Sequence, residues 1–393
     1  MRSEFLNFAP PLIGEEEIEE VVKTLREGWI TTGPRAQRFE TEFSAFVGAP
    51  AALAVNSATS AMHIALAALG IGEGDSVVST TMTFASSIHV IEHQRAHPVL
   101  VDVEPDTLNI DPEQVEAAVR RTPGVKAILP VHLYGHPADM DPIYDIARRY
   151  GLAVIEDAAH SLPARYHGRM IGAPKEGFDF PNLVAFSFYA TKNLTTGEGG
   201  MLTGPADLMD DARVWSLHGM SRDAFKRYTS DGSWRYDVVL PGFKYNMPDI
   251  QAAIGIHQLK RLEAMQSRRR AIVAQYDEAL GQLDELQRPA ERPDVESAWH
   301  IYLLRLNLER LKIDRAAFID ELRKRNIGTS VHFIPIDQHS FYRDRYGLRP
   351  EDFPIAHREF ERMLSLPLSP AHTDQDVADV IEAVTDVVRQ NRA

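Results

Sequence analysis

Short apolar runs alternate with amphipathic stretches between about residues 50 and 205. Seven of the apolar runs are predicted strands: Ala52–Val55, Ser76–Ser79, Pro98–Val103, Val125–Val131, Leu152–Glu156, Leu183–Phe188 and Gly200–Thr203. The stretches between them include predicted helices over Ala58–Leu69, Pro112–Arg121 and Met140–Tyr150. Strands that alternate with helices of this length predict a mostly parallel sheet covered on both faces. Ligands of such sheets bind outside the carboxyl ends of the strands.

The pattern changes after residue 248, where a long helix is predicted over Asp249–Leu280. A proline-containing loop, Arg288–Pro293, separates this helix from a smaller set of predicted elements. They are a strand at Trp299–Leu306, a helix at Ile313–Asn326 and a strand at Ser330–Pro335. A final helix is predicted because one of its faces is apolar, formed by Val377, Val380, Ile381, Val384, Val387 and Val388. We therefore expect an α/β protein with a large domain, residues 1–260, whose seven-stranded sheet is sandwiched by helices. A smaller C-terminal α+β domain is expected over residues 261–393.

Composition narrows the class of protein. The net charge of −14 argues against nucleic-acid binding, which needs a basic face. Since the chain has no cysteine, disulfides and thiolate chemistry are excluded. The N-terminal residues lack the pattern of a signal peptide, and the most apolar window, Ala51–Ile71, carries too many polar residues to cross a membrane. A soluble cytoplasmic protein without membrane partners is expected.

One lysine stands out in the segment AFSFYATKNLTTGEGG, residues Ala185–Gly200. The apolar strand ends in a polar turn that carries Lys192, flanked by Ser187 and Asn193, and glycines follow. A lone lysine at a strand end suits an amine that forms a Schiff base, provided that a pocket lowers its pKa, because only the neutral amine attacks a carbonyl. The alternative is a solvated turn lysine. The choice depends on whether the rest of the chain supplies a cofactor site.

Two further segments follow predicted strands and carry candidate chemistry. Asn56–His63 places Ser57, Thr59 and Ser60 at a helix N-terminus, which is either a phosphate site or a plain helix cap. Val154–Ser161 ends a buried strand in Glu156 and Asp157, with His160 close behind. A carboxylate there could keep a pyridine nitrogen protonated, or it could be satisfied by backbone amides.

Two weaker candidates come from loops. Phe84, within Thr81–Ser87, could stack on a flat ring or belong to the core. Asn246, within Pro241–Ala253, offers amide donors ahead of the long helix.

His89 and His93 belong to an H-x-x-E-H match, which is a zinc-peptidase signature. They fall in a crossover helix away from the expected strand ends, so we expect no metal site.

In order and spacing, the motifs SAT, TFAS, EDAAHS, SFxxxKN with GEGG, and KYNxxDIQAA closely resemble those of the DegT-type (DegT/DnrJ/StrS) nucleotide-sugar aminotransferases. These are pyridoxal-phosphate enzymes with the aspartate-aminotransferase fold. The resemblance runs from Trp29–Glu40 through Asn326–Phe333. It implies the cofactor pyridoxal 5'-phosphate, with the pyridoxamine form as an intermediate.

Carried over by motif, the resemblance assigns Lys192 as the Schiff-base and proton-transfer lysine, and Asp157 as the partner of the pyridine nitrogen. Phe84 is similar to the aromatic residue that stacks on the ring. The phosphate cradle corresponds to Ser57, Thr59, Ser60 and Ser187, and Asn246 to a contact from the partner subunit, which implies a homodimer with shared active sites. His160 matches a histidine near the cofactor. The sugar is expected near Thr31, Thr32, Gly33 and His332.

The implied reaction transfers an amino group from an amino acid, usually L-glutamate with 2-oxoglutarate as its product, to a nucleotide-linked keto-sugar. The KN–GEGG segment and the KYN loop resemble those of enzymes that aminate position 4 of the sugar. The product would be an amino sugar of a surface polysaccharide, a glycan or a secondary metabolite. A sugar dehydratase of the same fold remains an alternative, although such enzymes replace the lysine with histidine. A regulatory protein that binds the cofactor is the other alternative.

Overall fold

The computed structural model describes residues 2–221 and 236–393. Its largest element is a seven-stranded sheet in the order β1-β9-β8-β5-β4-β2-β3. The strands are β1 (Ala51–Val55), β2 (Ser76–Thr80), β3 (His97–Val101), β4 (Val125–Leu129), β5 (Ala153–Asp157), β8 (Asn182–Ser187) and β9 (Gly200–Gly204). β9 runs antiparallel to both of its neighbours, β1 and β8, and all other neighbouring strands pair in parallel. The predicted mostly parallel seven-stranded sheet is confirmed.

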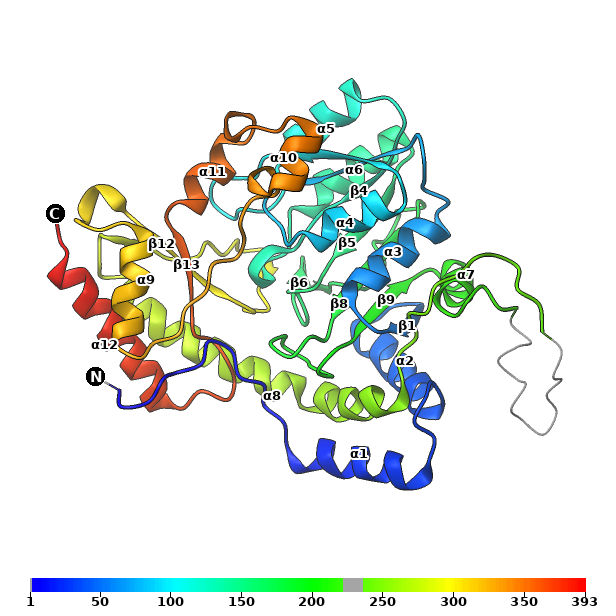
Figure 1. Ribbon diagram of the computed structural model, residues 1–393, viewed down its shortest axis with the longest axis horizontal. Helices are drawn as coiled ribbons and strands as arrows, with labels where there is room; N and C mark the ends of the chain where they lie inside the picture. The colour runs from blue at the N-terminus through cyan, green and yellow to red at the C-terminus, as the bar shows by residue number, and fades with distance from the viewer. Residues whose placement is uncertain (1, 222–235) are drawn as a thin grey trace.

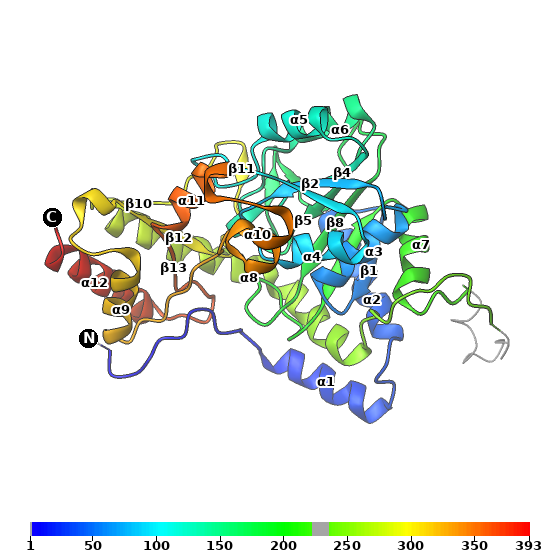
Figure 2. The same ribbon diagram turned by 45° about the horizontal axis from the view of Figure 1, so that its top comes forward.

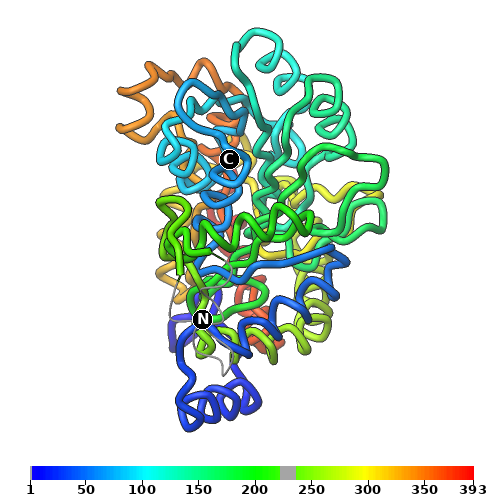
Figure 3. The backbone as a smooth tube through the Cα atoms, turned by 90° about the vertical axis from the view of Figure 1, so that its right-hand side faces the viewer, coloured from blue at the N-terminus to red at the C-terminus, as the bar shows by residue number. Residues whose placement is uncertain are grey.

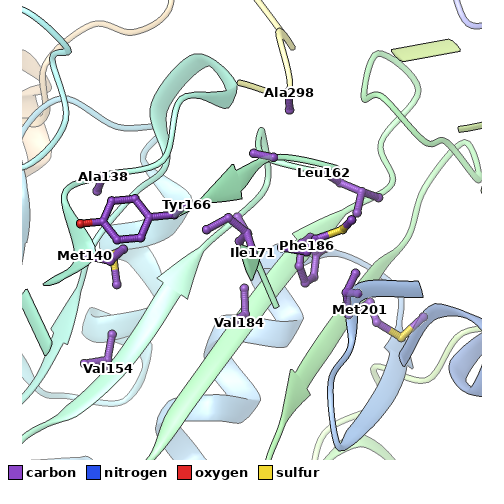
Figure 4. Close-up of a cluster of buried hydrophobic side chains, with 14 of the residues drawn as sticks. Ala138, Met140, Val154, Leu162, Tyr166, Ile171, Val184, Phe186, Met201 and Ala298 are labelled. Atoms are coloured by element: carbon purple, nitrogen blue, oxygen red, sulfur yellow. The ribbon is translucent and has the colours of Figure 1, made fainter. Parts of the chain in front are cut away.

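Helices cover both faces of this sheet (Figure 2). One face packs against α2 (Pro34–Val47), α5 (Pro112–Arg121), α6 (Met140–Tyr150) and part of α8 (Asp249–Leu280). Figure 4 shows part of that core, to which Val154, Val184 and Met201 contribute from three neighbouring strands. The other face packs against α3 (Ala58–Ala68), α4 (Ser86–His93) and α7 (Ala206–Ser216). Because successive side chains of a strand point to opposite faces of the sheet, neighbouring residues of each strand pack into different cores.

Helix α8, 32 residues long, links the large sheet to a smaller unit (Figure 1). Ala252, Ile256 and Leu262 from its first half belong to the large core, whereas Ile272 and Tyr276 belong to the core of the smaller unit. The predicted boundary between the two domains, at residues 260/261, falls inside this helix. The division into domains stays a prediction.

The smaller unit contains a three-stranded sheet in the order β10-β12-β13, formed by Leu286–Gln287, Tyr302–Leu306 and Met363–Leu366. Helices α9 (Arg315–Lys324) and α12 (Asp374–Gln390) pack against it. The predicted helix over 313–326 and the final helix are confirmed. The strand predicted from Trp299 begins only at Tyr302, because Trp299 has a left-handed φ of 47°.

The strand predicted at Ser330–Pro335 is wrong. Ser330 makes a single bridge to Ser365, and the chain then leaves the small sheet. His332 and Phe333, joined by a cis peptide bond, instead line the cavity described below. The third strand of the sheet is β13, which the sequence pattern did not single out.

The remaining elements connect these units. The N-terminal segment joins the small core through Leu6, which pairs with Ile327, and then leads into α1 (Glu15–Glu27). Figure 3 shows α1 at one end of the molecule. A small sheet is formed by β6 (Arg165–Tyr166), β7 (Arg169–Met170) and β11 (Val295–Glu296), while α10 (Ser340–Tyr346) and α11 (Pro354–Phe360) precede β13. In the part of the chain that the structure describes, no helix combines the length and the apolar character that a membrane span requires.

Candidate active site

A cavity of about 380 Å³ opens beside the carboxyl ends of the sheet strands. Eight of the predicted site residues line it: Ser57, Thr59, Phe84, Asp157, His160, Ser187, Lys192 and His332. They come from five separate segments of the chain. The parallel sheet brings the first four segments together because their strand ends lie at one edge, whereas His332 comes from the segment that follows α9.

Strand alternation decides which of the two consecutive carboxylates faces the cavity. Asp157 lines it, whereas Glu156 points to the opposite face of the sheet, where Tyr144 of α6 lies. Ser87 of α4 donates its hydroxyl to Asp157 Oδ2 at 2.7 Å, and the Ala159 amide donates to Oδ1 at 3.1 Å. Asp157 is thus buried and oriented by two donors, and no cation of the described chain is hydrogen-bonded to it.

Glu156 is fully buried and lies at the centre of a polar network behind the site. It accepts hydrogen bonds from His132 Nε2 (2.8 Å), Tyr144 (2.7 Å) and Asn182 (2.8 Å). Burial alone would raise the pKa of Glu156, but His132 and the other donors outweigh it and lower the pKa to about 2. Glu156 is therefore charged and structurally occupied, which leaves Asp157 for chemistry.

Lys192 lies in a compact loop that leaves β8 and returns at β9. The loop is closed by backbone bonds from Phe188 to Gly199 (2.8 Å) and from Thr196 to Phe188 (2.9 Å). Its lysine is half-buried and reaches the cavity. Burial lowers the pKa of Lys192 from 10.5 to about 8, although the charge of Asp157 opposes this shift. A substantial fraction of the amine is consequently neutral near physiological pH, as a nucleophile requires.

The N-terminus of α3 forms the polar wall of the cavity. Ser57 caps the helix, and its hydroxyl accepts from the Ser60 amide at 3.0 Å. Ser60, one of the predicted phosphate contacts, therefore uses its amide within the helix cap and does not line the cavity.

Gly200 allows β9 to pass close behind this helix start. A Cβ at this position would lie 2.4 Å from the carbonyl carbon of Ser57 and 2.6 Å from Ala58 N. The helix start, which is suited to an anion, is thus held against the strand that follows the lysine loop.

Phe84 presents an exposed aromatic face at the cavity. Its side chain is 59% exposed, and its ring centre lies 5.6 Å from that of Phe333. It does not belong to the core.

Three histidines surround Lys192, of which His160 and His332 were predicted and His300 was not. Burial and the charge of Lys192 lower all three pKa values, that of His332 to about 4. All three rings are therefore neutral at pH 7. Across residues 2–221 and 236–393, no three His, Asp or Glu side chains are grouped as metal ligands.

The remaining predicted residues lie together but do not line the cavity. Asn246 donates to the Thr32 hydroxyl at 2.6 Å, and Thr32 donates to the Met247 carbonyl at 2.6 Å. The Asp249 carboxylate accepts from the backbone N–H groups of Gly33 (2.8 Å), Arg35 (3.0 Å) and Ala36 (3.0 Å). The amide of Asp249 in turn donates to the Thr31 carbonyl at 3.0 Å. Asn246 and the loop Thr31–Gly33 thus form one ordered surface.

Sequence reasoning also missed Ser87 and Phe333. Ser87 belongs to the segment Thr81–Ser87 named above, but its hydrogen-bond partner Asp157 lies 70 positions away in the sequence. No local sequence pattern therefore marks the pair. His300 lies within the predicted strand Trp299–Leu306 and just ahead of the observed β12, and a polar residue at the start of a strand was the available signal.

Together, these groups match the needs of a planar phosphorylated cofactor with a carbonyl and a pyridine ring. They comprise an amine of lowered pKa, a buried carboxylate to which no cation of the described residues is hydrogen-bonded, a helix N-terminus and an exposed aromatic face. The close approach of Gly200 to Ser57 leaves the helix start fixed at one side of the cavity.

Comparison with known proteins gives an independent view of the same chain. The model of the DegT/DnrJ/EryC1/StrS aminotransferase family matches residues 11–385. The spore coat polysaccharide biosynthesis protein SpsC of Bacillus subtilis is 50% identical over 390 residues, which cover 99% of this chain and 98% of SpsC. An uncharacterized protein of Methanocaldococcus jannaschii is 50% identical over 393 residues, the full length of both chains.

Among solved structures, a putative sugar aminotransferase of Streptococcus pneumoniae in its PMP form superimposes with a TM-score of 0.90. It is 34% identical, and the match covers 98% of this chain and 99% of that one.

Proposed function

Because the chain belongs to the DegT/DnrJ/EryC1/StrS aminotransferase family, we propose that it uses pyridoxal 5'-phosphate to transfer an amino group to a nucleotide-linked keto-sugar. L-Glutamate is the proposed donor, and position 4 of the sugar the proposed acceptor. The observation that carries the proposal is the position of Lys192, with a pKa of about 8, in a cavity that also holds Asp157.

Each cavity residue has a role in this proposal. Lys192 attaches the cofactor, takes a proton from the donor carbon and returns one to the sugar carbon. Asp157, held by Ser87, keeps a proton on the pyridine nitrogen. Ser57, Thr59 and Ser187 bind the phosphate, and Phe84 covers the ring. The bound cofactor supplies the electron sink for the carbon that loses its proton.

The substrate proposal rests on the motif resemblance at the lysine loop and on the relatives. SpsC is named for spore coat polysaccharide biosynthesis, and the pneumococcal protein is described as a putative sugar aminotransferase. A role in making an amino sugar for a surface polysaccharide is consistent with both. Thr31, Thr32, Gly33 and His332 are the proposed sugar contacts.

A homodimer with shared sites would explain why Asn246 and the loop Thr31–Gly33 are ordered outside the cavity. In this proposal they complete the site of the partner subunit. Two large apolar side chains next to that loop are exposed, Trp29 (44%) and Ile30 (51%). Burial of such side chains favours association.

Borohydride reduction of the loaded protein, followed by peptide mass spectrometry, tests the role of Lys192. We expect the cofactor on the peptide that contains Lys192, and none in Lys192→Ala. The matched control is Lys260→Ala, which removes an exposed lysine on α8. Attachment at another lysine would overturn the assignment.

Incubation with ¹⁵N-glutamate and a panel of nucleotide-linked keto-sugars tests the substrate. We expect ¹⁵N at carbon 4 of a sugar product, detected by NMR. Label at carbon 3 would contradict only the proposed position, and transfer from another amino acid alone would contradict only the donor. No transfer from any donor to any sugar would overturn the proposed reaction.

A further inference from the structure

The side chain of Asn193, the residue directly after Lys192, is buried between two segments of the chain. Its Nδ2 donates to the carbonyl of Ala298 at 2.7 Å, and a carbonyl can only accept. This orients the amide, so its Oδ1 must face His300 Nδ1, which lies 3.1 Å away. Because that oxygen can only accept, Nδ1 of His300 carries the proton.

His300 is a neutral ring with one free lone pair. It is buried and lines the cavity, and burial and the charge of Lys192 hold its pKa well below 6.5. With the proton on Nδ1, the Nε2 atom is an acceptor. The backbone here is fixed by Arg269 of α8, whose guanidinium donates to the carbonyls of Trp299 (3.3 Å) and Leu368 (3.0 Å).

His160 has the opposite tautomer. Its Nδ1 accepts from the Tyr134 amide at 3.3 Å, so the neutral ring carries its proton on Nε2. The ring centres of His160 and His300 lie 4.5 Å apart. The cavity thus contains two uncharged imidazoles, of which His160 can donate and His300 can accept a hydrogen bond through Nε2. The tautomer of each ring is fixed by a residue that does not line the cavity.

We propose that Asn193 and His300 are a positioning pair for Lys192. Asn193 fixes the tautomer of His300, and the Nε2 lone pair of His300 accepts a hydrogen from the free amino group of Lys192, holding it ready for proton transfer. The pair also ties the lysine loop to the segment Ala298–His300 that enters the small sheet. The inference rests on the proposed role of Lys192 as the reactive amine.

Histidine ¹⁵N NMR of the full-length protein, before and after loading with cofactor, tests the tautomers. The signal of His300 is identified by its loss in His300→Gln. We expect His300 as the Nδ1–H form and His160 as the Nε2–H form. In Asn193→Leu, a similar volume without an acceptor, His300 should lose its preference for Nδ1–H. In Asn193→Asp it should keep that form and its pKa should rise, because a carboxylate stabilises the imidazolium.

Two NMR outcomes would overturn the proposal: an Nε2–H tautomer of His300 in the unmodified protein, or an unchanged tautomer in Asn193→Leu. If Asn193→Leu does not fold, the comparison with Asn193→Asp decides alone, and an unchanged pKa of His300 there counts against the pair.

Kinetics of the loaded enzyme provide the second readout. We expect His300→Gln to lower kcat by roughly 10- to 100-fold with little change in KM, since a displaced reacting group slows chemistry more than binding. His372→Asn, which removes a buried histidine outside the cavity, is the matched control and should retain its kcat. Equal losses of kcat in both variants would mean that His300 contributes only to packing. Failure of cofactor attachment to Lys192 in the unmodified protein would instead contradict the proposed function.

Discussion

At the residue scale, the surroundings of a side chain decide its pKa and whether it is free to face the cavity. Burial lowers the pKa of Lys192 to about 8 against the opposing charge of Asp157. Glu156 and Asp157 are neighbours in sequence, yet one is committed to a buried network and the other faces the cavity. These differences come from burial and strand alternation.

The pH dependence of cofactor attachment follows from Lys192. The neutral amine attacks, and its fraction rises as pH rises through the pKa. We expect the initial rate of attachment to apo-protein to reach half of its maximum near pH 8 and to level off above that value. Stopped-flow absorbance over a pH series measures this. A rate that is still climbing tenfold per pH unit well above that value would mean an unshifted lysine.

Ser87→Ala should weaken the site without removing a charged group. Hydrogen bonds to charged groups are worth about 1.5–3 kcal/mol, so Asp157 would be less firmly oriented. We expect a fall in kcat of roughly tenfold or more, since tenfold corresponds to about 1.4 kcal/mol. Ser216→Ala, which removes a buried hydroxyl on α7 that does not line the cavity, is the control, and equal effects in both variants would contradict the specific role of Ser87.

At the scale of elements, the helix start at Ser57 depends on Gly200 in β9. In Gly200→Ala the new Cβ would meet backbone atoms at 2.4–2.7 Å, so the strand and α3 must separate. Overpacking of this kind costs about 1–3 kcal/mol, and we expect weaker cofactor binding as well. Urea unfolding and cofactor titration measure the two effects. In the control Gly72→Ala the nearest atom is at 3.6 Å, and it should behave like the unmodified protein.

The Glu156 network joins β5, α6 and β8 and should make stability depend on pH. The folded pKa of Glu156, about 2, lies below the ordinary 4.5, so its contribution is complete above pH 4.5 and is lost as pH falls toward 2. Part of the acid sensitivity in this window should disappear in Glu156→Gln. Urea midpoints between pH 3 and 6 test this, and parallel curves for the two proteins would contradict it.

Most elements of the large sheet could be predicted from the sequence because their apolar runs are long enough to mark buried strands. The segment Ser330–Pro335 was wrongly predicted for the same reason, since it is an apolar run whose Phe333 lines the cavity and whose Ile334 is exposed. Lys192 and Asp157 follow recognisable strands. Ser87 and His300 could not be placed, because their partners Asp157 and Asn193 lie 70 and 107 positions away.

At the scale of the whole molecule, the proposed shared sites predict complementation between two inactive variants. A hybrid dimer of Lys192→Ala and Asn246→Ala contains one site with both native residues. After mixed refolding we expect activity to return to about a quarter of that of the unmodified enzyme, because about half of the dimers are hybrids. If activity stays at the level of the separate variants, Asn246 does not act across subunits. Light scattering of each protein checks that dimers form.

Helix α8 places its two halves in different hydrophobic cores. A cut of the chain near residue 260 would therefore leave each fragment with half a helix and an exposed apolar stripe. Neither fragment would be an independent folding unit, although co-expressed fragments could reassemble along the helix. The protein should accordingly unfold in one cooperative step, with α8 transmitting the loss of either core to the other.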